Sequence, residues 1–268
     1  MFIRDGVKLM AKRVPKTKFP TAATVTYERA LRKMVRQVGM EALKQFDKHV
    51  AKELMQVDSP TFTNDGIFDG LKKMFKALKN KAAAVFAPNK TERVAKQFVN
   101  NVNRANRHNL EQQMKAKGIA LVAAEPWVDD FMGRKIRENV GYIKNIEEEA
   151  YERIEKVVRE GVEKGSSAKV IRNSILEQVE ITEGRAQFLA VDQAGSILGQ
   201  MTAERHKNIG IEKFTWDTSG DERVRDTHRA LDGKVFAYDD PPTVGGRQVL
   251  PGEDYRCRCI SQPVFDDD

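Results

Sequence analysis

The sequence is poor in the features on which secreted and membrane proteins depend. Only 2 of its 268 residues are cysteines, and their positions one residue apart exclude a disulfide framework and fit a reducing compartment. The longest apolar runs, such as residues 119–124, fall far short of the roughly 20 residues that a membrane-spanning helix needs. The N-terminus has basic residues but no apolar stretch followed by a cleavage site, so we expect no signal peptide. These absences predict a protein that is neither secreted nor embedded in a membrane.

The motifs of common catalytic sites are also missing from the sequence. It contains no glycine-rich phosphate loop, no G-x-S-x-G elbow, no H-E-x-x-H pair and no evident pair of carboxylates. Aromatic residues make up 7% of the chain, and few of them stand among the lysines, which argues against recognition of bases by stacking. We therefore predict that the protein is not an enzyme and that any contact with DNA is independent of base sequence.

Charge, by contrast, is abundant and unevenly distributed. Charged residues form 32% of the chain, with a net charge of +7 and a mean hydropathy of −0.56. Counting Lys, Arg, Asp and Glu, residues 1–120 carry a net charge of +15 and residues 121–268 a net charge of −8. A positive field attracts either DNA or an acidic protein, although such lysines can also be the solvated faces of amphipathic helices. The candidate contact residues are Lys8, Lys12, Arg13, Lys16, Lys18, Lys72, Lys73, Lys76 and Lys79.

The hydrophobic pattern predicts a mainly α protein with a small α+β unit at its C-terminus. Apolar residues recur at three- and four-residue steps from about Thr24 onward, as on one face of a helix. Gly165-Ser166-Ser167 indicates a helix end followed by a new N-cap, after which we expect two helices, at about 167–178 and 182–206. The predicted organisation is a basic arm (1–20), a basic helical region (21–125), a helical region leading into the last module (126–210), and the α+β unit (211–268).

Within the last unit the pattern changes from helical to mixed. Lys213 to Trp216 alternates like a short strand, residues 221–230 favour a helix, and Asp232-Gly233 is a strong turn signal before a strand at 235–238. A loop rich in proline and glycine then leads from Pro241 to Gly252, and a final short strand follows the cysteines. Gly233 is expected to have a left-handed backbone conformation, which glycine adopts without steric cost.

Three residues of this unit form a candidate metal site. Cys257 and Cys259 project to the same side of an extended chain, because the side-chain period is two, and His228 lies upstream on the expected helix. Two thiolates and an imidazole supply three of the four tetrahedral positions of a structural zinc ion, with Asp217, Asp221, Asp226 or water as the fourth. The usual zinc spacing is C-x2-C rather than C-x-C, so two half-buried structural thiols with a hydrogen-bonded histidine, or a redox role, stay open. We expect Arg223 and Arg225 to pin carboxylates such as Asp217, Asp232, Glu253 or Asp254.

The run from Trp216 to Phe236 and the closing run from Pro251 to Cys259 resemble the signature of phage Mu protein F-like minor head proteins. About 55 residues match closely, and about 100 if the helices from Ser167 are included. One departure is Leu189-Ala190-Val191-Asp192, where the family usually has an Ala-Arg-Thr-Glu run. The motif residues are Trp216, Asp221, Arg223, Arg225, His228, Leu231, Asp232, Gly233, Pro251, Gly252, Cys257, Arg258 and Cys259.

The resemblance implies a minor capsid protein of a tailed phage, inside the head near the portal, and in the host cytoplasm during assembly. It implies a structural role in head morphogenesis and in DNA packaging or ejection. The implied partners are the portal protein, the major capsid or scaffolding protein, and packaged DNA bound without sequence preference. Two alternatives are a sequence-independent DNA-binding protein and a toxin- or nuclease-type effector delivered with the DNA.

Overall fold

A computed structural model describes residues 14–54, 64–121 and 124–265, and the predicted mainly α fold with a small C-terminal α+β part is confirmed. The chain divides into two compact units, each built from segments far apart in sequence. Unit 1 combines Met1–Pro20, Asn100–Asp130 and Ala194–Asp268, and unit 2 combines Thr21–Val99 and Phe131–Gln193. None of the described helices is long and apolar enough to cross a membrane.

Unit 2 is helical. It contains α1 (Thr21–His49), α2 (Ala51–Leu54), α3 (Asn64–Val85), the first part of α4 (Pro88–Lys117), most of α5 (Val128–Glu163) and the first part of α6 (Ala168–Asn208). The apolar residues that recur at three- and four-residue steps along α1 are all buried: Leu31, Val35, Val38, Ala42 and Phe46. The Tyr27 ring stacks on Phe98 at 4.0 Å between centroids, and its hydroxyl bonds Asn139 Oδ1 at 3.1 Å. Burial of the periodic apolar face therefore holds this unit together, as the pattern predicted.

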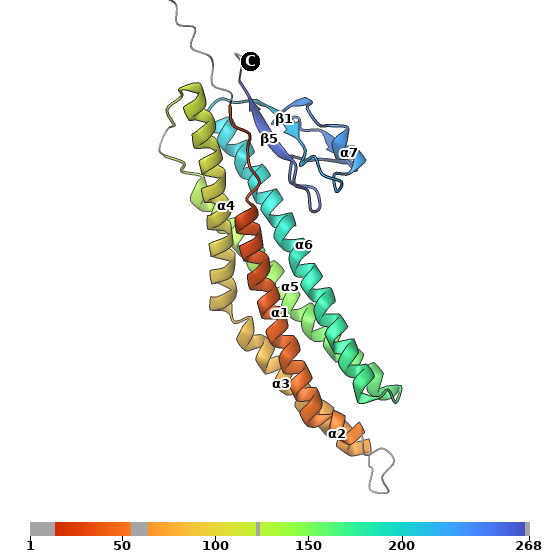
Figure 1. The fold of residues 1–268 in the computed structure, drawn as a ribbon. Coiled ribbons are helices and arrows are strands. Elements are labelled where there is room, and N and C mark those ends of the chain that lie inside the picture. The colour runs from red at the N-terminus through yellow and green to blue at the C-terminus, as the bar shows by residue number, and fades with distance from the viewer. Residues whose placement is uncertain (1–13, 55–63, 122–123, 266–268) are drawn as a thin grey trace, which may run out of the picture. The chain divides into compact units, whose positions relative to one another are not determined.

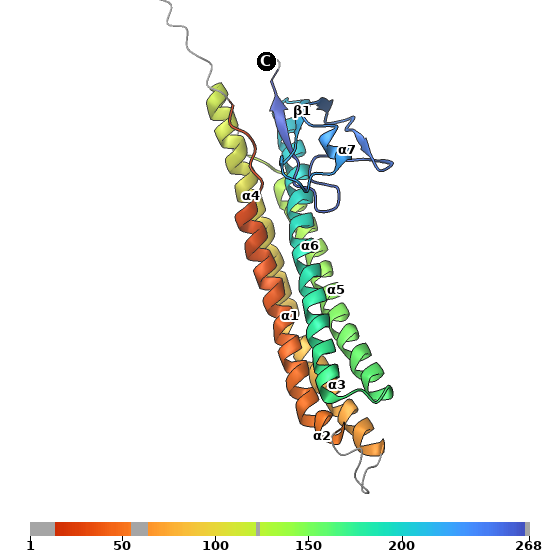
Figure 2. The same ribbon diagram turned by 45° about the vertical axis from the view of Figure 1, so that its right-hand side comes forward.

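The turn between α5 and α6 lies where the sequence predicted it. Helix α5 ends at Glu163, Gly165 has a φ of 66°, and the Ser167 hydroxyl accepts a hydrogen bond from the Val170 amide. Figure 2 shows the two helices turning back on one another at this point. A Cβ on Gly161 would lie 2.6 Å from Ile171 Cγ1, so glycine allows the two helices to come this close.

The expectation of two helices at about 167–178 and 182–206 is wrong, because α6 is continuous from Ala168 to Asn208. The interruption was expected around residues 179–181, but no glycine or proline stands there. The Thr182 hydroxyl donates back to the Gln178 carbonyl oxygen at 2.8 Å, a bond that is compatible with the helix interior. Packing against neighbouring helices then outweighs the modest helix propensity of the β-branched residues.

Unit 1 holds the α+β part. Its main sheet has the order β2-β1-β5, all antiparallel, with β1 (Lys213–Asp217) in the centre, β2 (Val235–Ala237) on one side and β5 (Ile260–Val264) on the other. Strands β1 and β5 lie side by side in Figure 1, with Trp216 opposite Ser261. The three predicted strands are thus confirmed.

Two details of this part differ from expectation. The helix expected over residues 221–230 shrinks to α7 (Asp226–Arg229), because Asp221 accepts hydrogen bonds from the Arg223 amide and the Arg258 guanidinium and so holds residues 221–225 in a turn. The loop after Pro241 contains a small hairpin, β3 (Thr243–Val244) with β4 (Arg247–Gln248). A Gly-Gly pair such as Gly245-Gly246 is typical of a two-residue hairpin turn, but the segment was predicted to be a loop.

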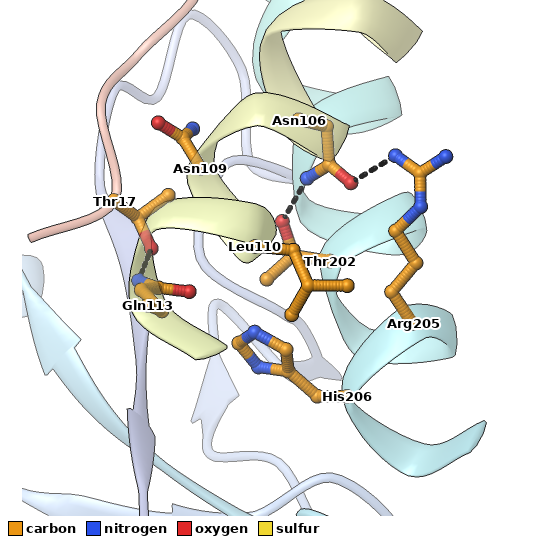
Figure 3. A pocket seen from close by; sticks show the side chains of 8 residues that line it. All are labelled: Thr17, Asn106, Asn109, Leu110, Gln113, Thr202, Arg205 and His206. Atoms are coloured by element: carbon orange, nitrogen blue, oxygen red, sulfur yellow. Dashed lines mark hydrogen bonds between the residues drawn. The ribbon is translucent and has the colours of Figure 1, made fainter. Parts of the chain in front are cut away.

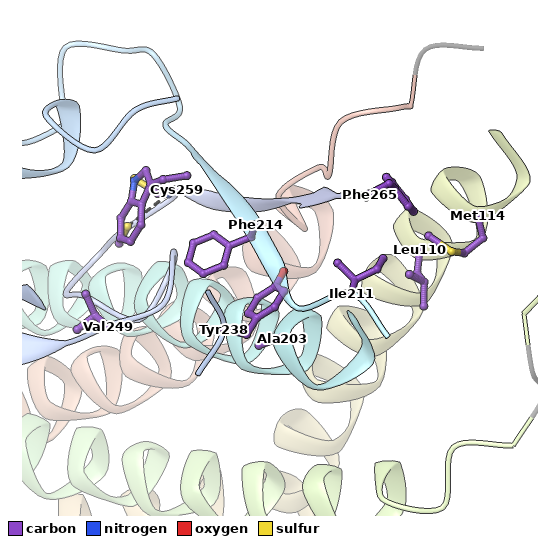
Figure 4. Packing of buried hydrophobic residues seen from close by; sticks show 11 residues of the cluster. Leu110, Met114, Ala203, Ile211, Phe214, Tyr238, Val249, Cys259 and Phe265 are labelled. Atoms are coloured by element: carbon purple, nitrogen blue, oxygen red, sulfur yellow. Dashed lines mark hydrogen bonds between the residues drawn. The ribbon is translucent and has the colours of Figure 1, made fainter. Parts of the chain in front are cut away.

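A hydrophobic cluster joins the sheet to the C-terminal parts of α4 and α6 (Figure 4). Phe214 and Trp216 are fully buried, and Gly233 has the expected left-handed φ of 75°. The cluster consists of Leu110, Met114, Ala203, Ile211, Phe214, Trp216, Tyr238, Val249, Cys257, Cys259 and Phe265. The small sheet is therefore stabilised by helices that come from the middle of the chain.

The loop before β5 crosses α6 at direct backbone contact. A Cβ on Gly195 would lie 2.5 Å from the Cys257 carbonyl oxygen and 2.7 Å from the Gly252 carbonyl oxygen. Gly252 itself has a φ of 97°, and a Cβ there would collide with Gly195. Both glycines are needed because no side chain fits between the helix and the loop.

The structure describes residues 14–20 of the predicted basic arm, and these residues pack against the rest of unit 1. The Thr17 amide donates to Gln262 Oε1 at 2.8 Å, and the Thr17 hydroxyl donates to the Ser261 carbonyl oxygen at 2.9 Å. From α4, the side-chain amide of Gln113 donates to the Thr17 hydroxyl (Figure 3). Residues 14–20 therefore run between β5 and α4.

A buried arginine lies beside this contact (Figure 3). The Arg205 side chain is 1% exposed, and its guanidinium donates to both carboxylate oxygens of Glu125, at 2.7 and 2.8 Å. It also donates to the side-chain oxygens of Asn103 and Asn106, which lie on the polar face of α4. The many asparagines of this helix thus include partners for a buried charge.

Candidate metal centre

The two cysteines and His228 meet in the interior of unit 1. Cys257 and Cys259 lie just before β5, and His228 lies on α7; their exposures are 4%, 3% and 2%. Between the cysteines, Arg258 turns the other way and pairs with Asp221. The predicted alternation thus directs both sulfurs to one side, toward the imidazole.

The geometry of the three donor atoms is compact. His228 Nδ1 lies 3.4 Å from Cys257 Sγ and 3.5 Å from Cys259 Sγ. All three ligand atoms lie within 4.8 Å of one another. The convergence of His228, Cys257 and Cys259 was predicted from the sequence and is present in the fold.

The surroundings favour negative charge on the Cys257 sulfur and disfavour it on the Cys259 sulfur. The Cys259 amide donates to Cys257 Sγ at 3.3 Å. A hydrogen bond from the Cys259 thiol, with the His228 imidazole nearby, lowers the pKa of Cys257 to about 5 against the opposing effect of burial. The Cys257 sulfur and burial raise the pKa of Cys259.

The other ring nitrogen of His228 contacts a carboxylate. His228 Nε2 lies 3.1 Å from Asp254 Oδ2, and the same oxygen accepts from Arg225 at 2.8 Å. Arg247 is a third partner, at 3.4 Å from Asp254 Oδ1. The Cys257 sulfur and this carboxylate raise the pKa of His228, against the effect of burial. The expected pinning of Asp254 by Arg225 is confirmed, whereas its role in orienting His228 was missed.

The aspartates considered as fourth ligands do not join the three donors. Asp217 bonds Lys16 and Gln262, Asp221 pairs with Arg258, and the Asp226 side chain is exposed to solvent. Among the residues that the structure describes, the potential metal-binding group at this place consists of the histidine and the two cysteines. The residues present fit a metal ion with three protein ligands.

The remaining motif residues support this centre or its loops. Asp232 accepts a hydrogen bond from the Thr218 amide at 2.8 Å, and the partly buried Leu231 packs against the hydrophobic cluster. Pro251 and Gly252 make the crossing over α6. Arg223 is exposed, with Glu222 at 3.8 Å, and so does not pin a loop carboxylate as expected. Most of the motif thus forms one connected structural set.

The predicted contact lysines are found in three situations. Lys8, Lys12 and Arg13 lie outside the described residues. Lys16 pairs with Asp217 at 2.9 Å, and Lys18 is exposed. The four predicted contact lysines of α3 are exposed, and Lys73 pairs with Asp69; they are Lys72, Lys73, Lys76 and Lys79.

Comparisons with known proteins agree with the site. Residues 152–262, which include α7 and both cysteines, match the family model described as phage Mu protein F like protein. A Haemophilus influenzae protein described as uncharacterized is 30% identical over 252 residues, which is 92% of this chain and 51% of that protein. The chain thus spans about half the length of that relative.

Two further relatives match over shorter segments. An uncharacterized protein of Methanocaldococcus jannaschii is 31% identical over 111 residues, covering 41% of this chain and 17% of that protein. A protein of Enterococcus faecalis named NAD(+)--arginine ADP-ribosyltransferase is 32% identical over 117 residues, covering 40% of this chain and 24% of that protein. No solved structure matches this chain. Over residues 152–262 the chain is therefore similar to the family described as phage Mu protein F like protein.

Proposed function

We propose that this protein is a minor head protein of a tailed phage, built into the virion close to the portal. The observation that carries the proposal is the family match over residues 152–262, which contains the whole connected motif around His228, Cys257 and Cys259. Interior side chains and loop-to-loop ion pairs account for most of this motif. Such a module serves as a stable docking unit, and its partners would be the portal and the capsid or scaffolding protein.

The composition of virus particles tests this proposal. Quantitative mass spectrometry of purified procapsids and mature virions, from a phage or prophage encoding this chain, should find it at a few copies per particle. Cross-linking before digestion should join it to the portal protein. Absence of the protein from both particles would refute the proposal, and its presence with cross-links only to other proteins would refute the location at the portal.

The exposed lysines of α3 support a second part of the proposal, which is contact with packaged DNA. Lys72, Lys76 and Lys79 border a surface hollow of about 360 Å³ together with Arg159 of α5. One acidic side chain, Glu155, lies in the same lining, where it pairs with Arg159. Four cations against one anion give this surface the positive field that phosphates require.

Charge reversal at Lys72, Lys76 and Lys79 is expected to weaken binding to duplex DNA. Each phosphate contact contributes about −0.9 to the slope of log affinity against log salt concentration. The triple glutamate variant should therefore show a slope flatter by about 3, equally for unrelated DNA sequences. The measurement is fluorescence anisotropy at several salt concentrations.

A matched control carries three glutamates at Lys156, Lys164 and Lys169, which are also exposed lysines of unit 2. Its net charge changes by the same amount, so it should keep most of the slope of the unaltered protein if the α3 surface is the contact. Equal slopes for the two variants would mean that only net charge matters. Binding that does not depend on salt would point to a protein partner for α3.

An effector function is a second candidate, favoured by one observation. The Enterococcus faecalis relative is named an arginine ADP-ribosyltransferase, but the match covers only 24% of that protein. We expect no transfer of ADP-ribose from labelled NAD+ to arginine-containing proteins by this chain. Labelling that depends on the chain would favour the effector over the structural protein.

A further inference from the structure

We propose that His228, Cys257 and Cys259 bind one zinc ion in unit 1, with a water molecule as the fourth ligand. This inference is independent of the proposed function. It concerns a structural site that ties the segment before β5 to α7, and its donor set of two sulfurs and one nitrogen is typical of zinc.

The distances between the donor atoms support a shared ion. With Zn–S bonds of about 2.3 Å and a Zn–N bond of about 2.0 Å, tetrahedral geometry separates nitrogen and sulfur by about 3.5 Å. The two observed separations, 3.4 and 3.5 Å, agree with this value. If His228 Nδ1 were only a hydrogen-bond donor, its N–H would point to one of the two sulfurs. Nearly equal distances from Nδ1 to both sulfurs are expected when the three atoms surround one metal ion.

The contacts of His228 favour the imidazole tautomer that carries its proton on Nε2 and leaves Nδ1 free to bind a metal ion. Asp254 is held by Arg225 and Arg247, so its carboxylate is positioned to accept a hydrogen bond from the Nε2–H of His228. The lone pair then stays on Nδ1, the atom that faces the two sulfurs. A carboxylate behind a zinc-binding histidine is the usual arrangement that fixes the ring and strengthens the ligand.

The environment of the sulfurs also fits thiolates bound to a cation. The Cys259 amide donates to the Cys257 sulfur. The indole N–H of Trp216 is fully buried and has no hydrogen-bond partner among the described residues. The Trp216 and His228 rings meet edge to face, with centroids 5.5 Å apart. Zinc would neutralise two buried thiolates that a neutral interior otherwise penalises.

Water is the fourth ligand because the aspartates near the motif are engaged elsewhere. The carboxylates of Asp217 and Asp221 have basic or amide partners, and Asp254 contacts the ring nitrogen that faces away from the sulfurs. Three protein ligands plus a small exogenous ligand is a common zinc arrangement. No catalytic step is implied by this water.

The first test measures metal content and ligands in the full-length protein. Protein purified without chelator from zinc-supplemented cells should contain about one zinc per chain. X-ray absorption should find two sulfur and two nitrogen or oxygen neighbours. The cobalt-substituted protein should show sulfur-to-cobalt charge-transfer absorption. Zinc-free protein that also takes up no zinc or cobalt in titration would overturn the proposal, and four light-atom neighbours without sulfur would overturn the ligand assignment.

Variants separate the site from adventitious binding. Cys257→Ser should lose zinc, and His108→Gln, at an exposed histidine of the same unit, should keep it. Because a ligand variant can unfold, Asp254→Asn is the second variant, and it should keep one zinc per chain but bind it 10–100-fold more weakly in a competition with a chelator. Unchanged zinc affinity in Asp254→Asn would contradict the positioning role of this carboxylate, and full zinc in Cys257→Ser would contradict the site.

Discussion

Replacing Arg205 with methionine is expected to destabilise unit 1 by about 3–5 kcal/mol, because it leaves the Glu125 carboxylate without its main partner in a partly buried site. The methionine retains most of the volume of the side chain, so the loss comes mainly from unpaired polar groups. In addition to Glu125, the side-chain oxygens of Asn103 and Asn106 lose a donor. Both tryptophans, Trp127 and Trp216, belong to unit 1, so tryptophan fluorescence during urea denaturation measures this loss directly.

The double variant Arg205→Met/Glu125→Gln is the control for this prediction. Removing both charges should restore a large part of the stability, since the cost of a buried ion pair is mostly that of the unpaired partner. If the single variant unfolds within about 1 kcal/mol of the unaltered protein, the network does not stabilise unit 1.

The pH dependence of stability provides a second readout for the same pair. Hydrogen bonds from Arg205 lower the pKa of Glu125 below its ordinary value, against the effect of burial. The folded state therefore binds this proton less readily than the unfolded state. The stabilisation is complete above the unfolded pKa of about 4.3, and it is lost as the pH falls through the folded pKa. In Arg205→Met this acid-side loss should shrink.

Replacing Trp216 with alanine should cost about 3–5 kcal/mol, because it removes the largest fully buried side chain of the protein from the cluster around β1. Trp216→Phe keeps part of that volume and should cost clearly less. Trp127 remains as the fluorescent reporter in both variants. Tyr255→Ala, at a ring 60% exposed in the same unit, should change stability by less than about 0.5 kcal/mol. Equal midpoints for Trp216→Ala and Tyr255→Ala would show that the cluster does not support unit 1.

Local sequence patterns predicted the helices and strands in which the hydrophobic period of a helix or of a strand is unbroken. The apolar face of α1, the turn at Gly165-Ser166-Ser167 and the strands around Trp216 and Cys259 were all predicted correctly. Residues 221–225 and the middle of α6 were predicted incorrectly. In both places the conformation depends on partners distant in sequence, such as Arg258 for Asp221, which a local pattern does not contain.

The candidate metal centre was likewise predicted only in part from the sequence. Residue type and two-residue spacing predicted that Cys257 and Cys259 share a side and that His228 is their partner. Only the tertiary structure placed Asp254 behind the imidazole and sent the aspartates considered as ligands to other partners. Only the tertiary structure showed that residues 14–20 lie against β5, and that glycine is needed where the loop before β5 crosses α6. The sequence by itself determined the helical class, the family motif and the donor atoms, because those depend on periodicity and chemistry along the chain. Which donors and backbone segments meet was decided by long-range packing, since that depends on contacts between segments as far apart as residues 17 and 261.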